Sequence, residues 1–534
     1  MSTISTAELS TLASSTEPRA TITTPPDASK ADLDEVRRGP NRVTEAEPMP
    51  SRKTTTVVIT SVTCITTLST LISGVVTVAI PTMAKDVNLD DSLLLWPASV
   101  YALVCGCTLL LSGSVADAVG NRFTYLVGCL LQAIFTLAGG LSRTGTQLIV
   151  FRAIAGLALS LCLPSAVSII TNSIPTGQRR NVAFACMGGG QPVGFSLGLT
   201  LGGVFSDTIG WRWGFHIAAA LNALVFGVAL WGLPAEVGIN YASSSIWGRI
   251  RNDIDWIGAF LASGSIAMLS YIFAALTTNA SNIKSPTNLI ILIVAILLIP
   301  TFVLWVARQT RLGRPALIPN SLWRSRIFST ICLCVLLTWG SFNALEQLLT
   351  FYFQYVQQVS ALETSLRFLP APVSGVAANL AMGLIVHKIP ANWIAISVAA
   401  ISCAASLIMA LAQPHQSYWA TSFISILLNP IGADSLFVVS NLLITSSFPA
   451  KTQALAGAVF NTVSQVGKSI GLASSAALAS SITAKSTAED KKGPEALLEG
   501  YHAAWWFCLA LNATTLILSV WGLRKVGRVG EKRD

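Results

Sequence analysis

The chain alternates between long apolar segments and short polar ones from residue 54 almost to its end. Each apolar segment approaches or exceeds the roughly 20 residues that an α-helix needs to cross the hydrocarbon core of a membrane. The strands of a transmembrane β-barrel are much shorter, about 10 residues, and alternate in polarity. The pattern therefore predicts an all-α polytopic membrane protein with fourteen spans, at residues 54–80, 92–112, 123–141, 147–170, 181–205, 215–233, 256–276, 287–306, 328–355, 366–386, 391–412, 418–446, 453–482 and 502–523.

Charged residues between the spans predict how the chain is threaded through the membrane. An even number of spans places both termini on one side, and Lys and Arg concentrate in the loops that follow even-numbered spans. Cytoplasmic loops carry such an excess, so we expect both termini in the cytoplasm. The loop after span thirteen is the exception, because acidic residues offset its lysines. The supporting residues are Arg122, Arg179, Arg180, Arg249, Arg251, Arg308, Arg311, Arg314, Arg324, Arg326, Lys388, Lys451, Arg524, Lys525 and Arg528.

Residues 1–53 differ in composition from the rest of the chain. They are rich in Ser, Thr, Pro and Ala and develop no apolar face, so we expect a disordered cytoplasmic tail. They also lack the apolar core of a cleaved signal peptide, and the first span is therefore expected to direct membrane insertion.

Composition supports a membrane protein and argues against several other classes. Of the 534 residues, 52% are hydrophobic and only 11% are charged, whereas soluble domains carry about 25% charged residues. The ten cysteines fall within apolar runs, where small core residues are expected instead of disulfides. The histidines lack metal-ligand spacing, and the basic loops account for the net charge of +9. The chain shows no Walker loop and no nucleophile–base constellation, so we expect no cofactor and no enzymatic activity. We also expect no metal site and no nucleic-acid partner.

Charged residues inside the spans are the first candidates for function, because an ionisable side chain in hydrocarbon is costly. They are Arg152, Glu346, Asp434 and Lys468. Alternatives are a structural pair between Glu346 and Lys468 or Arg152, an interfacial Glu346, and a helix-end anchor at Arg152. Polar and small residues follow helical spacing beside three of them, in the sets Asn343, Glu346, Gln347, Thr350 and Gln354; Asp434, Asn441 and Thr445; and Gly457, Asn461, Ser464, Lys468 and Gly471.

The loop after the second span reads GSVADAVGNRF, residues 113–123. Gly113 and Gly120 permit close helix approach and a tight turn. Asp117 and Arg122 stand where a breakable contact could lock two helices on one side of the membrane, as a gate requires. The pattern resembles the G-x-x-x-D-x-x-G-x-R signature of the major facilitator superfamily.

Further segments are similar to the fourteen-span drug:proton antiporter branch of that family. RAIAGLALSLCLPS (152–165) resembles the Arg-bearing motif of the fourth helix, and GWRWGFHIAAA (210–220) resembles the W-R-W signature before helix six. DIDWIGAFLASGSI (253–266) resembles the D-x-x-G start of helix seven. Two later segments, IGADSLFVVSNLLIT (431–445) and FPAKTQALAGAVFNTVSQVGKSIG (448–471), look most like fungal aminotriazole-resistance-type exporters. The resemblance covers about residues 54–525.

The resemblance implies a domain plan and an alternating-access cavity. There would be two six-helix bundles, at 54–234 and 328–523. Between them would lie a cytoplasmic loop (235–254), two insert helices (255–306) and a second cytoplasmic loop (307–327). A cytoplasmic tail would follow at 524–534. Spans nine and twelve would line the cavity. We therefore expect proton coupling from Arg152, Glu346 and Asp434. We expect the substrate to contact Asn343, Gln347, Gln354, Asn441, Asn461 and Lys468.

Two positions depart from the family pattern. The fifth-helix motif G-P-x-x-G-G has Leu199 in place of Pro, although the glycines at 194, 198, 202 and 203 remain and favour close packing. The acid that often occurs in the first helix is replaced by Ile72. Glu346 and Asp434 therefore become the leading candidates for the proton or cation site.

We expect a secondary transporter that exports a small organic compound, such as a toxin, drug or secondary metabolite, in exchange for protons. It would act as a monomer in the plasma membrane. The alternative is a facilitator or importer of a small polar solute such as ammonium or borate, which Ile72 and Leu199 favour slightly. A transporter-like sensor is a third reading, but the chain shows no long folded cytoplasmic extension.

Two N-glycosylation sequons test the predicted threading. Asn279 would lie on the outer side, either available for glycosylation or too close to the membrane for it. Asn512 lies inside the last span, where no modification is expected.

Overall fold

The computed structural model describes residues 52–90, 93–175, 178–234, 246–252, 254–278, 285–318, 320–386, 388–447, 450–488, 490, 493–524 and 526. These residues form helices and connecting turns, with no strand among them. The long helices correspond one to one with the predicted spans: α2 (Arg52–Asp86), α3 (Trp96–Val119), α4 (Asn121–Gly140), α5 (Gly145–Ser173), α6 (Gln178–Asp207), α7 (Arg212–Gly232), α9 (Trp256–Thr278), α10 (Pro286–Arg311), α11 (Arg326–Phe351), α13 (Pro370–Ile385), α14 (Ala391–Ala410), α15 (Ser422–Ser447), α16 (Ala450–Lys485) and α17 (Pro494–Gly522).

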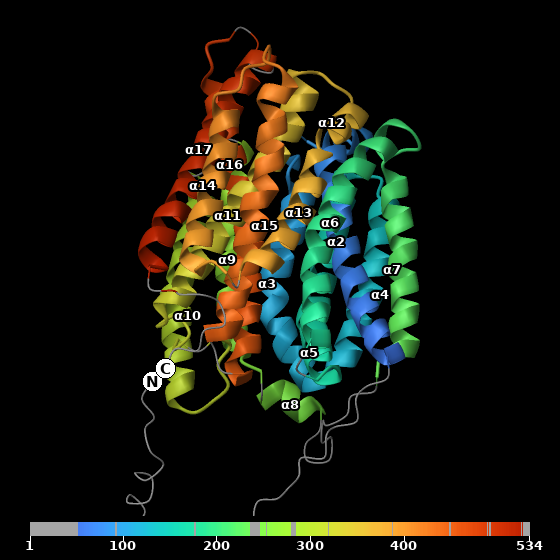
Figure 1. The fold of residues 1–534 in the computed structure, drawn as a ribbon, viewed down its shortest axis with the longest axis vertical. Coiled ribbons are helices and arrows are strands. Elements are labelled where there is room, and N and C mark those ends of the chain that lie inside the picture. Colours follow the sequence, from blue (N-terminus) through green and yellow to red (C-terminus); the bar gives the residue numbers. More distant parts are fainter. Residues whose placement is uncertain are drawn as a thin grey trace, which may run out of the picture. The chain divides into compact units, whose positions relative to one another are not determined.

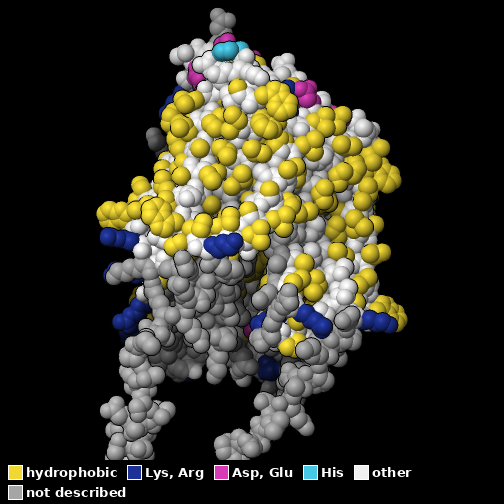
Figure 2. Space-filling view, in the orientation of Figure 1, with side chains coloured by type: hydrophobic (Ala, Val, Ile, Leu, Met, Phe, Trp, Pro, Cys, Tyr) yellow, Lys and Arg dark blue, Asp and Glu magenta, His cyan; other side chains and the backbone are white. Residues whose placement is uncertain are grey.

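Twelve helical segments of the described chain are long and apolar enough to cross a membrane. Beyond these twelve, α9 has a shorter apolar stretch, Trp256–Ile272, and α16 is rich in Ser, Ala and Gly. Both still pack among the spanning helices, α9 on α3 and α16, and α16 on α3, α11 and α17. Apolar side chains cover much of the face shown in Figure 2, as lipid contact requires. The predicted all-α polytopic fold is confirmed.

The helices contact one another in two groups. In the first, α2 packs on α6 and α7, α5 packs on α3 and α4, and α4 packs on α7. In the second, α11 packs on α16 and α17, α14 on α15 and α17, and α13 on α15. The pair α9 and α10 lies along the α3 and α16 side, where the two groups meet.

Short elements distinguish the two ends of this helix bundle. The helix α8 (Ile246–Asn252) lies at one end and α12 (Ala361–Arg367) at the other, at the bottom and the top of Figure 1 respectively. We name these the α8 end and the α12 end. Also at the α12 end are a π-helical turn, η3 (Tyr352–Val356), that continues α11, and a 3₁₀ turn, η4 (Tyr418–Ala420), that precedes α15.

The structure refines the predicted span boundaries. The tenth span is broken into α12 and α13, and α13 begins at Pro370, a position where the missing N–H of proline is harmless. The last helix begins at Pro494, eight residues before the predicted span, and α8 was not predicted. The tail at 1–53 and Asn279 lie outside or almost wholly outside the described residues.

Glycines allow α2 and α6 to cross at backbone contact. A Cβ atom built on Gly74 would lie 2.1 Å from the Phe195 carbonyl oxygen, and one on Gly198 would lie 2.0 Å from that of Leu71. Gly194 and Gly202 face α2 in the same way, whereas Gly203 faces α12. Because these neighbours are backbone atoms, they cannot move aside as a flexible side chain could.

Leu199, where a proline was expected, is 1% exposed within an unbroken α6. This helix still contains a proline, Pro192, two turns earlier. The packing of α2 on α6 therefore depends on small residues without a proline at position 199.

We predict that Gly198→Ala destabilises the folded protein, because the new methyl group would overlap the Leu71 carbonyl. The expected loss is about 1–3 kcal/mol, the usual cost of overpacking. Gly189→Ala on the same helix is the matched control, since a Cβ there meets nothing within 4 Å and alanine is the better helix former. The measurement is the thermal midpoint of the purified protein in detergent. Equal midpoints for the two variants would contradict the close α2–α6 contact.

Candidate functional site

A central cavity of about 90 Å³ lies between the two groups of helices. Residues from α2, α3, α5 and α6 line one side, and residues from α11, α13, α15 and α16 line the other. The charged residues predicted inside the spans all reach this cavity, although they are far apart in the sequence. They are Arg152, Glu346, Asp434 and Lys468.

Glu346 lies in the middle of α11 and is 1% exposed. The Asn429 side-chain amide of α15 donates to its Oε1 atom at 3.0 Å. Its Oε2 atom has no hydrogen-bond partner among the described residues. A buried acceptor left unpaired costs free energy, and such a group calls for an explanation. Here the unpaired atom belongs to a side chain that lines a cavity, so a ligand or a proton can satisfy it.

Asp434 and Lys468 extend the charged side of the cavity. The Lys468 ammonium lies 4.4 Å from the centre of the Trp339 ring and close enough to Asp434 for an electrostatic interaction. Asp434 also interacts electrostatically with Glu346. Its Oδ2 atom would lie 3.0 Å from a Cβ atom at Gly375, so α13 packs against this carboxylate without a side chain between them.

Arg152 contributes a positive charge from the other side of the cavity. It is 3% exposed, its Nε atom donates to the Pro97 carbonyl at 3.0 Å, and its guanidinium lies 4.2 Å from the centre of the Tyr101 ring. Its Nη2 atom has no hydrogen-bond partner in the described part of the chain. Burial at this level does not fit a helix-end anchor that reaches the membrane surface.

The remaining polar residues predicted for the substrate cavity fall into two sets. Asn343 and Gln347 line it. The other three do not: Gln354 lies in η3, where its amide donates to the Val78 carbonyl at 3.0 Å, Asn461 donates to the Gly457 carbonyl at 2.9 Å, and Asn441 is exposed on α15. The helical spacing placed them on the correct elements, but each lies two or more turns from the cavity or bonds to its own helix.

Sequence reasoning missed the wall that α2 contributes. Thr66, Thr70, Ser73 and Thr77 all line the cavity, and their spacing of i, i+4, i+7 and i+11 marks one face of a helix. The same spacing had singled out the polar face of α11. Ile72, which replaces the usual acid, is instead buried in the apolar core with Val76 and Leu199.

The loop motif between α3 and α4 lies away from the cavity, at the α8 end. Gly120 separates the two helices with φ of 123°, a conformation that favours glycine. Gly113 packs against Pro164 of α5, Asp117 is exposed, and Arg122 donates to the Leu230 carbonyl at the end of α7. One contact of Arg122 is therefore with the end of a helix.

Hydrogen bonds close the cavity at the α12 end by joining the two groups of helices. The Gln347 amide donates to the Thr77 carbonyl at 3.1 Å, beside the bond from Gln354 to Val78. On α12, the Ser365 hydroxyl donates to the Leu199 carbonyl and accepts from the Gly203 N–H at 2.9 Å. The Leu362 N–H donates to Asp207 at 2.7 Å. Most of these bonds use backbone groups, so they can break without leaving a charge buried.

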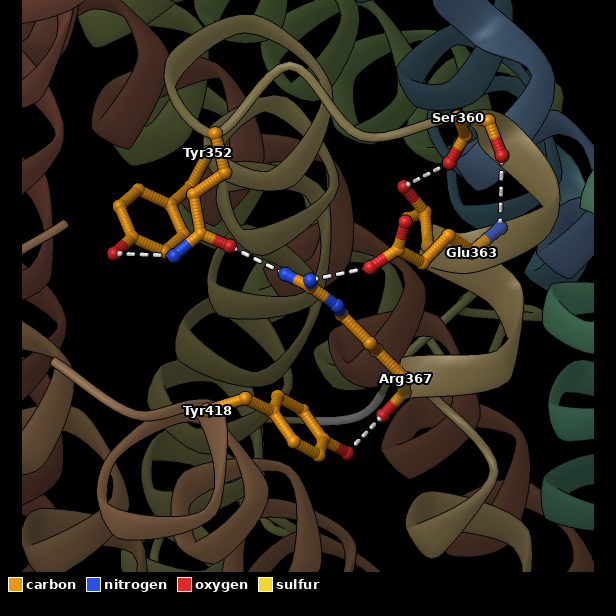
Figure 3. A network of polar contacts seen from close by, with 7 residues as sticks. Tyr352, Ser360, Glu363, Arg367 and Tyr418 are labelled. Carbon is orange, nitrogen blue, oxygen red and sulfur yellow. Dashed lines mark hydrogen bonds and ion pairs between the residues drawn. The ribbon is translucent and has the colours of Figure 1, made fainter. Parts of the chain in front are cut away.

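A second network holds η3 and α12 in place (Figure 3). The Arg367 guanidinium donates to Gln357 and Glu363 and lies 5.2 Å from the centre of the Phe353 ring. The Tyr418 hydroxyl donates to the Arg367 carbonyl at 2.7 Å, and Ser360 caps α12. A π-helical turn often marks a functional position in a helix, and here it ends the helix that carries Glu346.

Asn512, the sequon residue of the last span, is buried in α17. Its amide donates to Ser341 at 2.8 Å, to Ser406 at 3.0 Å and to the Ser402 carbonyl at 3.2 Å. The side chain therefore lies inside the last helix and the bundle, and the absence of modification there stays a prediction.

A polytopic helix bundle that encloses a charged cavity and closes it at one end is the architecture of a membrane transporter. The chain belongs to the Major Facilitator Superfamily, whose family model matches residues 62–472. A protein of Pyricularia oryzae named MFS-type transporter 1 is 42% identical over 517 residues, which cover 89% of this chain and 84% of that protein. A protein of Aspergillus terreus named Efflux pump terJ is 26% identical over 456 residues and covers 84% of each chain.

Among solved structures, the fold resembles a bacterial homolog of the human lysosomal transporter Spinster, in its inward-facing and unoccupied conformation. The TM-score is 0.58 at 15% identity, over 89% of this chain and 98% of that one. This likeness establishes the shared fold.

We predict that Arg367→Lys lowers the thermal midpoint more than Glu363→Ala does. Lysine keeps the charge but cannot donate to Gln357 and Glu363 together in a planar fork, whereas the half-exposed Glu363 contributes about 0–1 kcal/mol through its ion pair. Arg367→Ala should be the most destabilising. Thermal unfolding of the three variants in detergent measures the order, and a larger effect of Glu363→Ala than of Arg367→Lys would contradict the network's arrangement.

Proposed function

We propose that this transporter exports a small organic compound in exchange for protons. The observation that carries the proposal is the unpaired Oε2 atom of Glu346, inside a cavity that also holds Asp434 and Lys468. A carboxylate at this depth is stable only if a proton, a cation or a hydrogen-bond donor compensates it. Alternate occupation by a proton and by substrate would therefore couple their movements.

Alternating access would give the exchange its route across the membrane, and the proton gradient would set its direction. We propose that residues 54–234 and 328–523 act as two bundles, and that the bonds from Gln347 and Gln354 to α2 and from α12 to α6 form only when the cavity is closed at the α12 end. Breaking them and closing the α8 end would expose the same side chains to the other side. Arg122 and the loop of Asp117 lie at the end where the second closure would form.

The distribution of charge supports the α8 end as the cytoplasmic one. Basic side chains gather toward that end on the face shown in Figure 2. By the order of the helices, Arg249 in α8, Arg308 near the end of α10, Arg326 at the start of α11 and Lys388 after α13 belong to that end. Cytoplasmic surfaces carry such an excess. We therefore propose cytoplasmic termini, a plasma-membrane location and an outward closure at the α12 end. Asn279, between α9 and α10, would then be on the outer side.

Export is favoured over import by the kinship with an efflux pump. A carrier of this kind needs no enzymatic step, and we propose that one copy of the chain is the working unit. Growth of pump-deficient yeast expressing the protein on toxins, ammonium analogues and borate tests the direction and the substrate range. Resistance confined to organic compounds supports export, whereas altered growth on ammonium analogues or borate alone would replace it by a small-solute carrier.

We predict that Glu346→Gln abolishes proton-driven transport of a compound identified in that growth panel, while the protein still folds and reaches the membrane. Glutamine keeps the shape and the bond to Asn429 but cannot release a proton. The measurement is uptake into inside-out vesicles with an imposed pH gradient. Glu363→Gln, on a half-exposed residue at the α12 end, is the matched control. Transport that remains driven by the gradient in the cavity variant would rule out the coupling role of Glu346.

We also predict that a disulfide between Asp207→Cys and Leu362→Cys stops transport reversibly. The two positions are in contact, since the Leu362 N–H donates to Asp207, and a bridge would hold the α12 end closed. The measurement is vesicle uptake before oxidation, after oxidation and after reduction, with each single variant as control. Full transport by the cross-linked protein would show that the α12 end does not open during the cycle.

A further inference from the structure

The hydroxyl groups on the α2 wall donate their protons to carbonyl groups of their own helix. Thr70 donates to the Thr66 carbonyl at 3.1 Å, Ser73 to the Ser69 carbonyl at 3.1 Å, and Thr77 to the Ser73 carbonyl at 2.9 Å. Thr66 donates to the Thr63 carbonyl at 2.9 Å. A hydroxyl has a single proton and two lone pairs. With their protons used in this way, these four side chains offer lone pairs toward the cavity.

Other polar groups around the cavity also use a donor within the protein. Ser99 of α3 donates to the Leu95 carbonyl at 3.0 Å, and the Asn343 amide donates to the Trp339 carbonyl at 3.0 Å. The Gln347 amide is bound to the Thr77 carbonyl. Each keeps an oxygen that can accept, and each of the two amides keeps a second N–H. Together with the unpaired Oε2 of Glu346, the hydroxyl oxygens of α2 and Ser99 make this part of the lining rich in acceptors, which favours a ligand that carries donors.

Three buried donors of the lining have no partner in the described chain: Nη2 of Arg152, Nε1 of Trp339 and the Tyr101 hydroxyl. The arginine and tryptophan atoms require an acceptor from the ligand, whereas the hydroxyl can donate or accept. Lys468, the remaining cation, lies over the Trp339 ring and interacts electrostatically with Asp434. A complementary ligand therefore presents several N–H donors to α2 and Glu346 and one acceptor or π-face to Arg152.

We propose that the cavity binds a compound with a protonated primary or secondary amine, whose N–H groups bridge the Thr70 and Ser73 hydroxyls and Glu346. The inference rests on the proposed transport function and names its substrate class. An ammonium group offers up to three N–H donors and a positive charge that compensates the Glu346 carboxylate. A quaternary ammonium offers charge without donors, and an anion would meet lone pairs and a carboxylate.

This arrangement also gives a reason for the neutral first helix. The hydroxyl stripe supplies acceptors on the α2 side without adding a charge. Ile72 is 2% exposed and packs into the core. In this proposal α2 selects the substrate and α11 binds the proton. Substitutions on α2 should therefore change substrate selection without changing proton binding.

Binding to the purified full-length protein in detergent tests the proposal. The probes are 1-naphthylmethylamine, its N,N,N-trimethyl analogue and 1-naphthylacetate, which share one ring system, measured by isothermal titration calorimetry. We expect the primary amine to bind at least about tenfold more tightly than the other two, the effect of losing one hydrogen bond to a charged group. Equal or tighter binding of the trimethyl compound or of the acid would overturn the inference.

Variants locate the site independently of that ranking. Thr70→Val with Ser73→Ala should weaken the amine at least about tenfold and leave the trimethyl compound unchanged. Thr301→Val is the matched control, because Thr301 makes the same bond to its own helix, at 2.7 Å, on the exposed face of α10. Amine affinity that is unchanged in the double variant would also overturn the inference. The proposed function has its own test. It fails if the Glu346→Gln variant keeps gradient-driven transport, whichever of the three probes binds most tightly.

Discussion

The cost of holding Glu346 away from water constrains the rest of the structure. A charged side chain at the centre of a bilayer costs at least about 2.5 kcal/mol, and only one of its two oxygens is bonded, to Asn429. The surrounding helices reduce this cost without removing it. They bring Lys468 to Asp434, close the α12 end over the cavity, and leave Oε2 free to be satisfied by something that enters. A fully paired carboxylate would be more stable but could not exchange partners.

Close helix packing allows such a site to exist in a cavity of about 90 Å³. The glycine contacts between α2 and α6 hold the hydroxyl wall firmly, because Gly74 and Gly198 bring backbone against backbone. By contrast, the two groups of helices meet at the α12 end through apolar side chains and a few hydrogen bonds that mostly use backbone groups. Strong contacts within a group and breakable ones between groups are the mechanical requirement of alternating access.

The fold could be predicted from the sequence because hydrophobic length is a direct physical signal of membrane spans. The charged site residues could be predicted for the same reason: Arg152, Glu346, Asp434 and Lys468 are costly in hydrocarbon wherever they point. Gln354, Asn441 and Asn461 could not be placed correctly, because an uncharged polar side chain can bond to its own helix and carries no comparable penalty. The α2 hydroxyls were missed because Ser and Thr are common in such helices. The break at Pro370 and the π-helical turn depend on packing against Arg367 and Tyr418, which periodicity does not encode.

The two sides of the cavity differ in a way that matters for coupling. The α2 side offers neutral acceptors, and the α11 and α15 side carries both carboxylates, with Arg152 reaching in from α5. Glu346 and Asp434 are the two carboxylates of the lining, and Asp434 interacts electrostatically with Lys468. The proposed exchange therefore centres on the unpaired oxygen of Glu346 on α11. Because η3 and the Arg367 network end that same helix, the atom proposed to exchange protons and the contacts proposed to open the α12 end belong to one continuous element.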